Sequence, residues 1–409
     1  MSKVSRRPLI VKFGGSSLAN ARLINAAAGS VAREYSRGGR VVVIVSAVGN
    51  TTDSLVNLTN GGSAMVETDR DDILAMGERT SARIFAAALK AKGIQARYFD
   101  PSDKDWPIIT DDLFSNANPL KERTVPRIRR YVAPILGEGV VPVIGGFIGR
   151  TRDGRISTLG RGGSDTTALL LATALEAEEV VLVTSVGGIM SGDPKLVNDP
   201  KHLRKIDIKT LVGIADSGTK FIHRKALQYK DPNINIRVVS YRHGNLRSHG
   251  TTITGKPLPA LDVRIHNPDK ISSITLVGKT LPKNADLTKQ AIQIVRHNLL
   301  AVSEDSDSMI LYVSDVSSIK QQINRLHDAV VRSSSGIALA TRRGLSLITV
   351  KGVGLEETPG VVANLSGALQ SSGINIFGIL TIASSVVVVV EWKLRKMAAR
   401  LIRTRLELN

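Results

Sequence analysis

The sequence predicts an α/β protein in which a doubly wound, mostly parallel sheet is followed by two smaller ferredoxin-like βαββαβ units. Three observations predict this fold. Short β-branched runs alternate with helical patterns through the first 250 residues, those runs are almost continuously apolar, and a strand-helix-strand-strand-helix order appears twice further on. Alternating strands and helices are typical of a doubly wound sheet, whose strands are covered by helices on both faces and therefore read as apolar runs.

The first domain is expected to span residues 1–255. Its expected strands are residues 9–13, 41–46, 140–144, 180–184 and 236–240, and helical patterns lie at residues 21–36, 74–92 and 165–177. Residues 242–259 are rich in glycine, proline, histidine and asparagine, which marks the end of this domain. A chain of 409 residues is long enough for roughly two to four domains with sizeable cores.

Two similar units, residues 270–340 and 341–409, are expected after this boundary. In the first unit, strands are expected at 274–277, 299–303 and 309–314 and helices at 285–297 and 318–331. In the second, strands are expected at 345–350, 374–382 and 386–392 and helices at 360–371 and 394–406. This order is the ferredoxin-like pattern, with residues 336–341 as a candidate final strand of the first unit.

Composition excludes several classes of protein. There is no cysteine, so disulfide scaffolds, thiolate metal sites and cysteine nucleophiles are excluded. The apolar runs are far shorter than the ~20 residues of a membrane-spanning helix, and no secretory leader is recognised, so we expect a cytoplasmic protein without a membrane partner. A net charge of +19 raises nucleic-acid binding as an alternative, but only 4% of residues are aromatic and the basic residues are scattered. We expect a basic surface that suits small anions instead.

The first candidate site follows the strand at residues 9–13. Lys12-Phe13-Gly14-Gly15-Ser16-Ser17 ends that strand in a lysine and continues through two glycines into a helix. Glycines let the main chain approach a ligand, and free N–H groups at a helix start bind phosphate. The lysine precedes the glycines, so this is not a Walker A loop. Taken alone, the segment also fits an ordinary strand-to-helix turn.

The second candidate site is Thr158-Leu159-Gly160-Arg161-Gly162-Gly163-Ser164-Asp165. Ser164 or Asp165 can cap the helix that follows, which is the purely structural interpretation. That interpretation leaves Arg161 unexplained, because an arginine in a glycine loop is suited to bind a carboxylate or a phosphate. Both loops follow parallel strands, so they are expected to face one crevice at the carboxyl edge of the sheet.

Together these segments resemble the aspartate kinase family. Residues 12–17 are similar to its opening KFGG(T/S)S, and residues 159–165 match its LGRGGSD segment. Further matches are Ser46-Ala47, Thr51-Thr52-Asp53, residues 77–82, residues 145–149, Thr184 with Gly188-Ile189 and Asp193-Pro194, and residues 218–223. Residues 350–361 and 373–376 are similar to the regulatory ACT domains of that family. The resemblance covers essentially the whole chain.

The resemblance implies ATP-dependent phosphorylation of the β-carboxylate of L-aspartate, the entry step to lysine, threonine and methionine synthesis. It implies that Lys12 contacts the transferring phosphoryl group, that Lys220 is a second phosphate-side cation, and that Asp165 orients the lysine or the substrate ammonium. The implied ATP-binding residues are Lys12, Gly14, Gly15, Ser16, Gly162, Gly163, Thr184, Ser185, Met190, Lys195, Lys220 and Phe221. Magnesium would arrive with ATP, held mostly by phosphates and water rather than by protein ligands.

The amino-acid pocket needs opposite charges at its two ends. Arg161 suits the α-carboxylate and Glu78 the α-ammonium, while Ser46 and Thr52 can donate hydrogen bonds to the reacting carboxylate; Ser164 completes the expected substrate residues. Two alternatives stay open: Glu78 could be an exposed helix residue, and Thr52 a turn residue.

Several positions depart from the family's pattern. Ser185 and Met190 stand where the family usually has aspartate and tyrosine, Arg224 stands where it usually has proline, and Pro282-Lys283 where a Pro-Gly turn is common. These departures affect the expected ATP contacts and effector binding. Ser185 and Met190 also support the alternative of a catalytically inactive amino-acid sensor. Another amino-acid kinase of the superfamily, acting on glutamate, N-acetylglutamate or UMP, is a second alternative.

The resemblance also implies pairing between chains and an effector. ACT-like units commonly associate side by side and bind amino acids between them. We therefore expect a homodimer or a dimer of dimers joined through residues 270–409, with an amino-acid effector at the ACT-like units.

Overall fold

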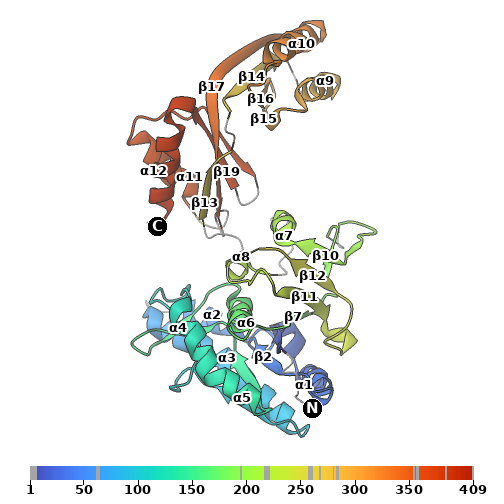
Figure 1. Cartoon of the computed structure of the whole chain (residues 1–409), viewed down its shortest axis with the longest axis vertical. Coiled ribbons are helices and arrows are strands. Elements are labelled where there is room, and N and C mark those ends of the chain that lie inside the picture. The colour runs from blue at the N-terminus through green and yellow to red at the C-terminus, as the bar shows by residue number, and fades with distance from the viewer. Residues whose placement is uncertain are drawn as a thin grey trace. The chain divides into compact units, whose positions relative to one another are not determined.

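The computed structural model describes residues 7–60, 65–193, 196–215, 222–256, 261–266, 269–279, 281, 285–352, 355, 359–382 and 385–407. The chain divides into two compact units, Met1–Leu258 and Pro259–Asn409 (Figure 1). The finer division of the second unit at residues 340/341 stays a prediction.

An eight-stranded sheet forms the centre of the first unit. In order across the sheet, its strands are β10 (Lys205–Asp207), β12 (Thr251–Thr254), β11 (Asn235–Ser240), β7 (Glu179–Thr184), β1 (Leu9–Phe13), β2 (Val41–Val45), β4 (Val141–Gly145) and β3 (Ala96–Phe99). The strands from β11 to β3 run parallel, whereas β12 is antiparallel to β11. The predicted doubly wound, mostly parallel sheet is confirmed.

Helices and short hairpins connect these strands. The helices are η1 (Gly15–Leu18), α1 (Ala21–Ser36), α2 (Thr51–Asn60), α3 (Glu67–Lys90), α4 (Lys121–Arg127), η2 (Ile128–Val132), α5 (Ala133–Gly137), α6 (Gly163–Ala174), α7 (Ile208–Ala215), α8 (Arg224–Leu227) and η3 (Tyr241–His243). The short strand pairs are β5 (Ile148–Arg150) with β6 (Ile156–Thr158) and β8 (Ile189–Met190) with β9 (His202–Leu203). Helix α3 begins earlier than predicted, because its first turns are acidic and carry no apolar periodicity.

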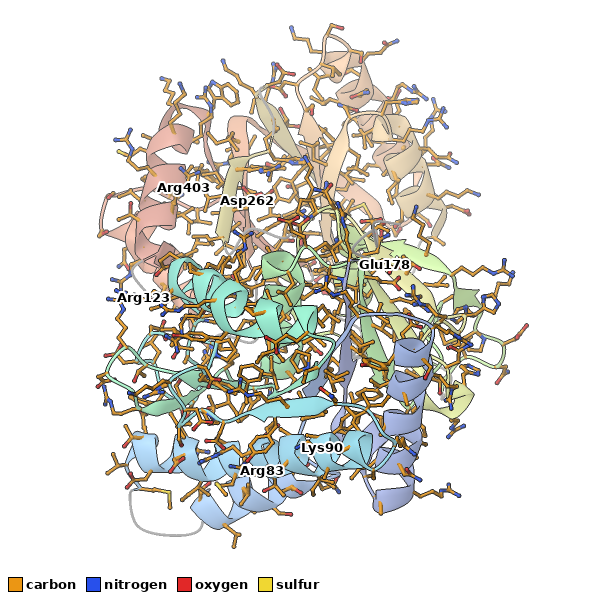
Figure 2. The ribbon with its side chains drawn as sticks, turned by 60° about the horizontal axis from the view of Figure 1, so that its bottom comes forward. Arg83, Lys90, Arg123, Glu178, Asp262 and Arg403 are labelled. Carbon is orange, nitrogen blue, oxygen red and sulfur yellow. The ribbon has the colours of Figure 1, made fainter. Side chains whose placement is uncertain are left out.

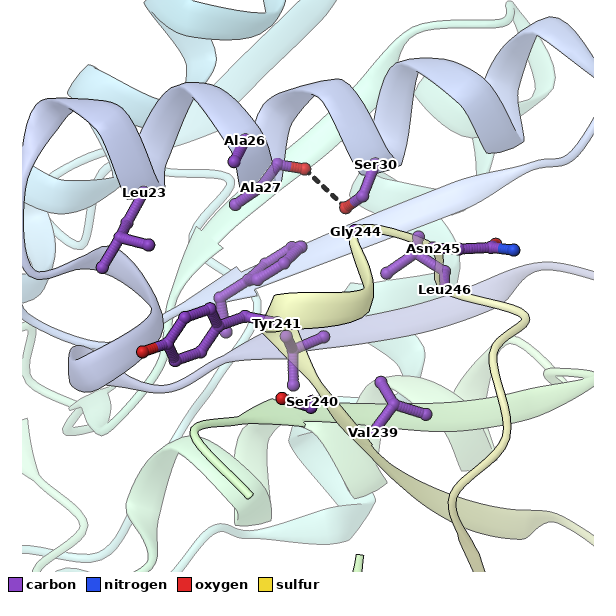
Figure 3. A pocket seen from close by; sticks show the side chains of 12 residues that line it. Leu23, Ala26, Ala27, Ser30, Val239, Ser240, Tyr241, Gly244, Asn245 and Leu246 are labelled. Carbon is purple, nitrogen blue, oxygen red and sulfur yellow. Dashed lines mark hydrogen bonds between the residues drawn. The ribbon is translucent and has the colours of Figure 1, made fainter. Parts of the chain in front are cut away.

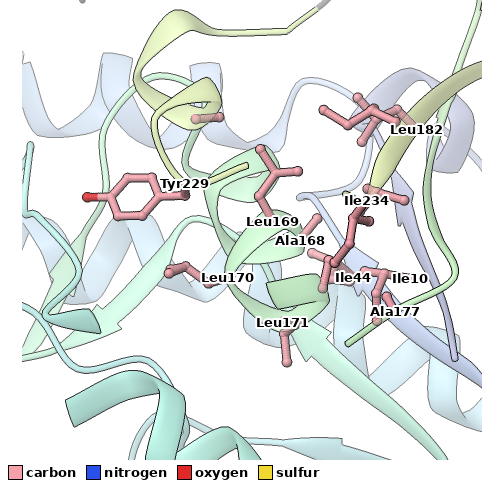
Figure 4. Close-up of a cluster of buried hydrophobic side chains, with 14 of the residues drawn as sticks. Ile10, Ile44, Ala168, Leu169, Leu170, Leu171, Ala177, Leu182, Tyr229 and Ile234 are labelled. Atoms are coloured by element: carbon pink, nitrogen blue, oxygen red, sulfur yellow. The ribbon is translucent and has the colours of Figure 1, made fainter. Parts of the chain in front are cut away.

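Two cores lie on opposite faces of this sheet. One face packs against α1 and α3, through residues such as Leu9, Val11 and Phe85. The other face packs against α6, where Ile10 and Ile44 meet the apolar run of that helix (Figure 4). Because successive side chains of a strand point to opposite faces, each of these continuously apolar strands serves both cores.

The second unit is built on a seven-stranded sheet. Its strands are β13 (Leu261–Ile265), β14 (Ile271–Gly278), β15 (Leu299–Glu304), β16 (Ser308–Ser314), β17 (Gly336–Gly352), β18 (Gly378–Ile382) and β19 (Ser385–Glu391). Every pairing is antiparallel. Its helices are α9 (Ala285–Val295), α10 (Ile319–Arg332), α11 (Val361–Gln370), η5 (Trp392–Leu394) and α12 (Arg395–Glu407). The predicted βαββαβ pattern is confirmed.

One long strand serves both halves of this sheet. Residues 336–341 and 345–350 were expected as separate strands, but both belong to β17. The first part of β17 pairs with β14, and its last part pairs with β13 and β19. Gly344 has a φ of +75°, a conformation that favours glycine and lets the strand change direction without ending. The strand expected at 374–382 is also shorter, since β18 begins at Gly378.

Charged side chains lie over many elements of the surface. Figure 2 labels Arg83 and Lys90 on α3, Arg123 on α4 and Arg403 on α12, all of them exposed. Several arginines form ion pairs within the chain: Arg83 with Asp100, Arg237 with Glu179 at 2.6 Å and Arg247 with Glu34 at 2.7 Å. Among the described residues, no helix is long and apolar enough to cross a membrane.

Candidate active site

Lys12 of β1 forms an ion pair with Asp165 of α6, because its side chain points to the face of the sheet on which α6 packs. Ile10 points to the α6 face, and Lys12 follows it two residues later. Its Nζ lies 2.9 Å from Oδ1 of Asp165, in the first turn of α6, and the two side chains are only 15% and 10% exposed. An ammonium is therefore held by a carboxylate at the carboxyl edge of the central strand.

Ser46 and Ser164 meet beside this pair. Ser46 follows β2 directly, and its N–H donates to the main-chain oxygen of Phe13 at 3.0 Å. Its Oγ donates to Oγ of Ser164 at 3.1 Å. Ser164 is the neighbour of Asp165 on α6. The structure thus brings together two predicted substrate residues and two predicted catalytic residues.

The glycine turn after β1 packs tightly against the loop that follows β2. A side chain at Gly15 would begin 2.8 Å from the oxygen of Gly49 and 3.0 Å from that of Ala47. Gly14 donates its N–H to the oxygen of Val183 at 3.3 Å, and Ser16 is exposed at the start of η1. The turn is therefore closely packed at the start of η1, where the first N–H groups of a helix can bind an anion.

Glu78 reaches this edge of the sheet from α3 and is only 3% exposed. Its Oε1 accepts a hydrogen bond from the N–H of Ala47 at 3.0 Å, and its buried Oε2 has no hydrogen-bond partner among the described residues. Burial raises the pKa of Glu78 to about 7, although the hydrogen bond from Ala47 and the positive charge of Lys12 oppose that shift. The alternative that Glu78 is an exposed helix residue is excluded.

The loop that carries Arg161 is a hydrogen-bonded turn, and Arg161 itself is exposed. Gly160 and Gly162 have φ values of +69° and +74°, and the N–H of Gly163 donates to the oxygen of Gly160 at 3.0 Å. Arg161 makes no hydrogen bond or ion pair with any residue that the structure describes. The turn thus presents a guanidinium whose donors are available to an anionic ligand.

The remaining predicted residues are more dispersed. Thr52 lies in the first turn of α2, half-buried, so it is a helix residue rather than a turn residue. Thr184 ends β7 and bonds through Oγ1 to the main chain of Val186, Ser185 is exposed, and Met190 lies half-buried in β8. Lys195, Lys220 and Phe221 lie outside the described residues.

Two supporting residues carried no signal in the sequence. Asp71 is fully buried in α3, and its carboxylate accepts hydrogen bonds from N–H and hydroxyl groups of both Ser115 and Thr158. Lys225 in α8 donates to oxygens next to the Arg161 loop. Their partners are distant in sequence, so no local motif marks them.

A small apolar pocket lies away from these residues, on the α1 face of the sheet. Figure 3 shows Leu23, Ala26, Ala27 and Ser30 of α1 facing the segment from Val239 to Leu246. Its free volume of about 20 Å³ is close to what one water molecule needs, so it does not hold a nucleotide or an amino acid.

Fold and site together define a small-molecule kinase with an attached regulatory region, in which a lysine and two glycine loops lie at the carboxyl edge of a parallel sheet. The amino acid kinase family model matches residues 7–240, and the ACT domain model matches residues 340–404. The chain belongs to the amino acid kinase family, and within it to the aspartokinases.

Aspartokinases from several organisms are similar to this chain. The aspartokinase of Geobacillus stearothermophilus is 31% identical over 383 residues, which cover 90% of this chain and 89% of that protein. The aspartate kinase of Synechocystis shares the fold, with a TM-score of 0.77 at 23% identity over 97% of this chain and 69% of that chain. Aspartokinase III of E. coli, solved with aspartate and ADP, has a TM-score of 0.56 at 23% identity over 98% and 99% of the two chains.

Proposed function

We propose that this protein transfers the γ-phosphoryl group of ATP to the β-carboxylate of L-aspartate, giving 4-phospho-L-aspartate and ADP. The observation that carries this proposal is the meeting of Lys12, Asp165, Ser46 and Ser164 beside the buried Glu78. Membership of the aspartokinases supports the same reaction.

The reaction requires positioning and charge neutralisation rather than a base, because a carboxylate is already a nucleophile. A carboxylate oxygen of aspartate attacks the γ-phosphorus, and the bond from that phosphorus to the bridging oxygen of ADP breaks. Lys12 neutralises charge on the transferring group, and Asp165 holds its ammonium in place at 2.9 Å. The main-chain N–H groups of Gly15 and Ser16 bind phosphate oxygens, while Gly14, whose N–H already donates to Val183, lets the chain turn closely beside them.

The substrate amino acid is held at its two charged ends. Arg161 binds the α-carboxylate, and the unpartnered Oε2 of Glu78 accepts a hydrogen bond from the α-ammonium. Ser46, Ser164 and Thr52 donate hydroxyl hydrogen bonds to the reacting carboxylate.

Magnesium is proposed to arrive on ATP. The described residues bring together no group of three or more histidine, cysteine, aspartate or glutamate side chains that could hold a metal, and Asp165 is already paired with Lys12. Phosphate oxygens and water would then supply most ligands, which is the usual arrangement for Mg²⁺ at phosphoryl-transfer sites.

Aspartate binding is expected to strengthen as pH rises through the pKa of Glu78. At pH 6 a group with a pKa of about 7 is mostly protonated and neutral, whereas at pH 8 it is mostly a carboxylate that can pair with the α-ammonium. The ionised fraction rises about tenfold between these values, so KM for aspartate should fall about tenfold. Steady-state kinetics at fixed ionic strength measure this change.

Glu78→Gln is the matched control for that prediction. The amide keeps the shape of the side chain but does not ionise, so KM for aspartate should be high and nearly independent of pH. The preference for aspartate over succinate, which lacks the ammonium, should also shrink. An unchanged pH profile in this variant would assign the dependence to another group.

A coupled ADP-release assay tests the reaction itself. With ATP and magnesium present, L-aspartate is expected to release ADP, while L-glutamate, N-acetylglutamate and UMP should not. Activity with one of the other acceptors would identify a different kinase of the superfamily. Absence of ADP release with every acceptor would favour an inactive amino-acid sensor.

The second unit is proposed to join chains into a homodimer or a dimer of dimers and to bind an amino-acid effector. Light scattering of the full chain and of residues 1–258 measures the contribution of the second unit. We expect the full chain to have at least twice the mass of one chain and the shortened chain to be a monomer. Equal oligomeric states would contradict this role.

The proposed cellular setting follows from the reaction. An aspartate kinase supplies the first intermediate for lysine, threonine and methionine synthesis, and we place it in the cytoplasm.

A further inference from the structure

Lys225 lies outside the residues assigned to aspartate or to the nucleotide, yet its ammonium is surrounded by oxygens. Nζ lies 3.0 Å from the main-chain oxygen of Asn116, 2.7 Å from its Oδ1, 3.1 Å from the oxygen of Ala117 and 3.0 Å from the oxygen of Leu159. These four acceptors belong to two segments that are far apart in the sequence. Lys225 therefore connects them through one charged group.

One of those acceptors immediately precedes the turn that presents Arg161. Leu159 is fully buried, its N–H donates to the oxygen of Phe147 at 2.8 Å, and its own oxygen accepts from Lys225. His223, which caps the start of α8, packs against Gly162 at the other end of the turn. The contact is so close that a side chain at Gly162 would collide with His223. The turn is thus held at both ends by residues 223–225.

The acceptors require a protonated amine. Burial lowers the pKa of Lys225 to about 8, and the carboxylate of Asp111 opposes that shift, so at pH 7 the group is still mostly an ammonium. If Lys225 lost its charge and its donors, the four oxygens would lie close together in a partly buried space without hydrogen-bond donors. Each of them would then carry an uncompensated desolvation cost.

We propose that Lys225 is a positioning residue for the aspartate site: its ammonium fixes the turn that presents Arg161 to the α-carboxylate. This inference rests on the proposed function, because it assumes that Arg161 binds aspartate. Arg161 has no hydrogen bond or ion pair with another described residue, so the position of the turn sets where its side chain starts and therefore which anions its guanidinium can reach.

Lys225→Met tests the proposal with little change in side-chain length. KM for aspartate is expected to rise roughly tenfold or more, since small displacements of a substrate-binding group are costly. KM for ATP should rise by clearly less, because Gly162 and Gly163 of the same turn are implied nucleotide contacts but carry no side chain that the displacement would misplace. Lys230→Met is the matched control. Lys230 is also buried and donates to two main-chain oxygens, those of Asp231 and Gly255, at 2.9 Å, but these oxygens do not belong to the Arg161 turn. This control should leave both KM values unchanged.

A double variant separates positioning from general loss of structure. If Lys225 acts through Arg161, then Lys225→Met should add little to the KM of Arg161→Ala, so the two effects should be strongly non-additive. Asn116→Ala removes one of the four acceptors, Oδ1, together with the rest of the amide group, and keeps the three main-chain acceptors, so it should raise KM for aspartate by about two- to fivefold. This variant still tests the proposal if Lys225→Met does not fold, as judged by circular dichroism.

Each outcome is decisive. Equal rises in KM for both substrates, additive effects with Arg161→Ala, or an unchanged KM for aspartate in a folded Lys225→Met would overturn the positioning role. A native chain without aspartate-dependent ADP release would overturn the proposed function, and this inference with it.

Discussion

Lys12→Ala is expected to lower kcat by about 10²–10⁴-fold while KM for aspartate stays nearly constant. The lysine is assigned to charge that develops on the transferring phosphoryl group, and its ion pair with Asp165 at 2.9 Å prepares it in the correct place before the reaction. Loss of such a preorganised cation removes stabilisation that exists only in the transition state, so kcat should fall while the affinity for aspartate is unchanged.

Kinetics of the purified variant measure this effect, with Lys90→Ala as the control. Lys90 is an exposed lysine of α3, and its loss should leave kcat unchanged. Thermal unfolding must accompany the assay, because Lys12→Ala leaves the buried carboxylate of Asp165 without its ion-pair partner. A folded Lys12→Ala variant with near-normal kcat would show that Lys12 only ends a strand.

Arg161→Ala is expected to raise KM for aspartate by roughly 10–150-fold, because a charge-assisted pair contributes about 1.5–3 kcal/mol. Some loss of kcat should accompany it, since a misplaced substrate moves its β-carboxylate out of line with the γ-phosphate. KM for ATP should change little. Arg161 is exposed and has no hydrogen bond or ion pair with another described residue, so the variant should have the same Tm as the unchanged protein.

Arg152→Ala is the matched control for this variant. Arg152 is an exposed arginine in the turn between β5 and β6, and its removal should not alter either KM. If Arg161→Ala raised KM for ATP and left KM for aspartate unchanged, Arg161 would belong to the phosphate cradle. The assignment of the amino-acid pocket would then be wrong.

Much of the fold and part of the site could be predicted because their signals are local. The apolar runs at residues 9–13 and 41–46 correspond to β1 and β2. The two-residue alternation of a strand then places Lys12 and Ser46 on one face. The start of helix α3 was predicted too late, because its first turns carry acidic residues. One of these, Asp71, accepts hydrogen bonds from Ser115 and Thr158, which lie far from it in the sequence.

The long strand of the second unit shows the same limit. Residues 336–341 and 345–350 were expected as two separate strands, but their pairings with β14, β19 and β13 hold both parts in one strand, β17. Strand pairing is a long-range interaction, and it overrides the local preference of a glycine for a turn.

By itself, the sequence determined the alternation of strands and helices around the main strands of the first unit, the repeated strand-helix order of the second, the two glycine loops and the residues that match the aspartokinases, because periodicity and spacing are properties of neighbouring residues. Only the tertiary structure decided that Glu78 is buried with a pKa of about 7 and that Lys225 holds the Arg161 turn. The ionisation of a side chain depends on which groups exclude water from it, and the partners of Lys225 lie 66 to 109 residues away in the chain. Such effects exist only once the chain has folded.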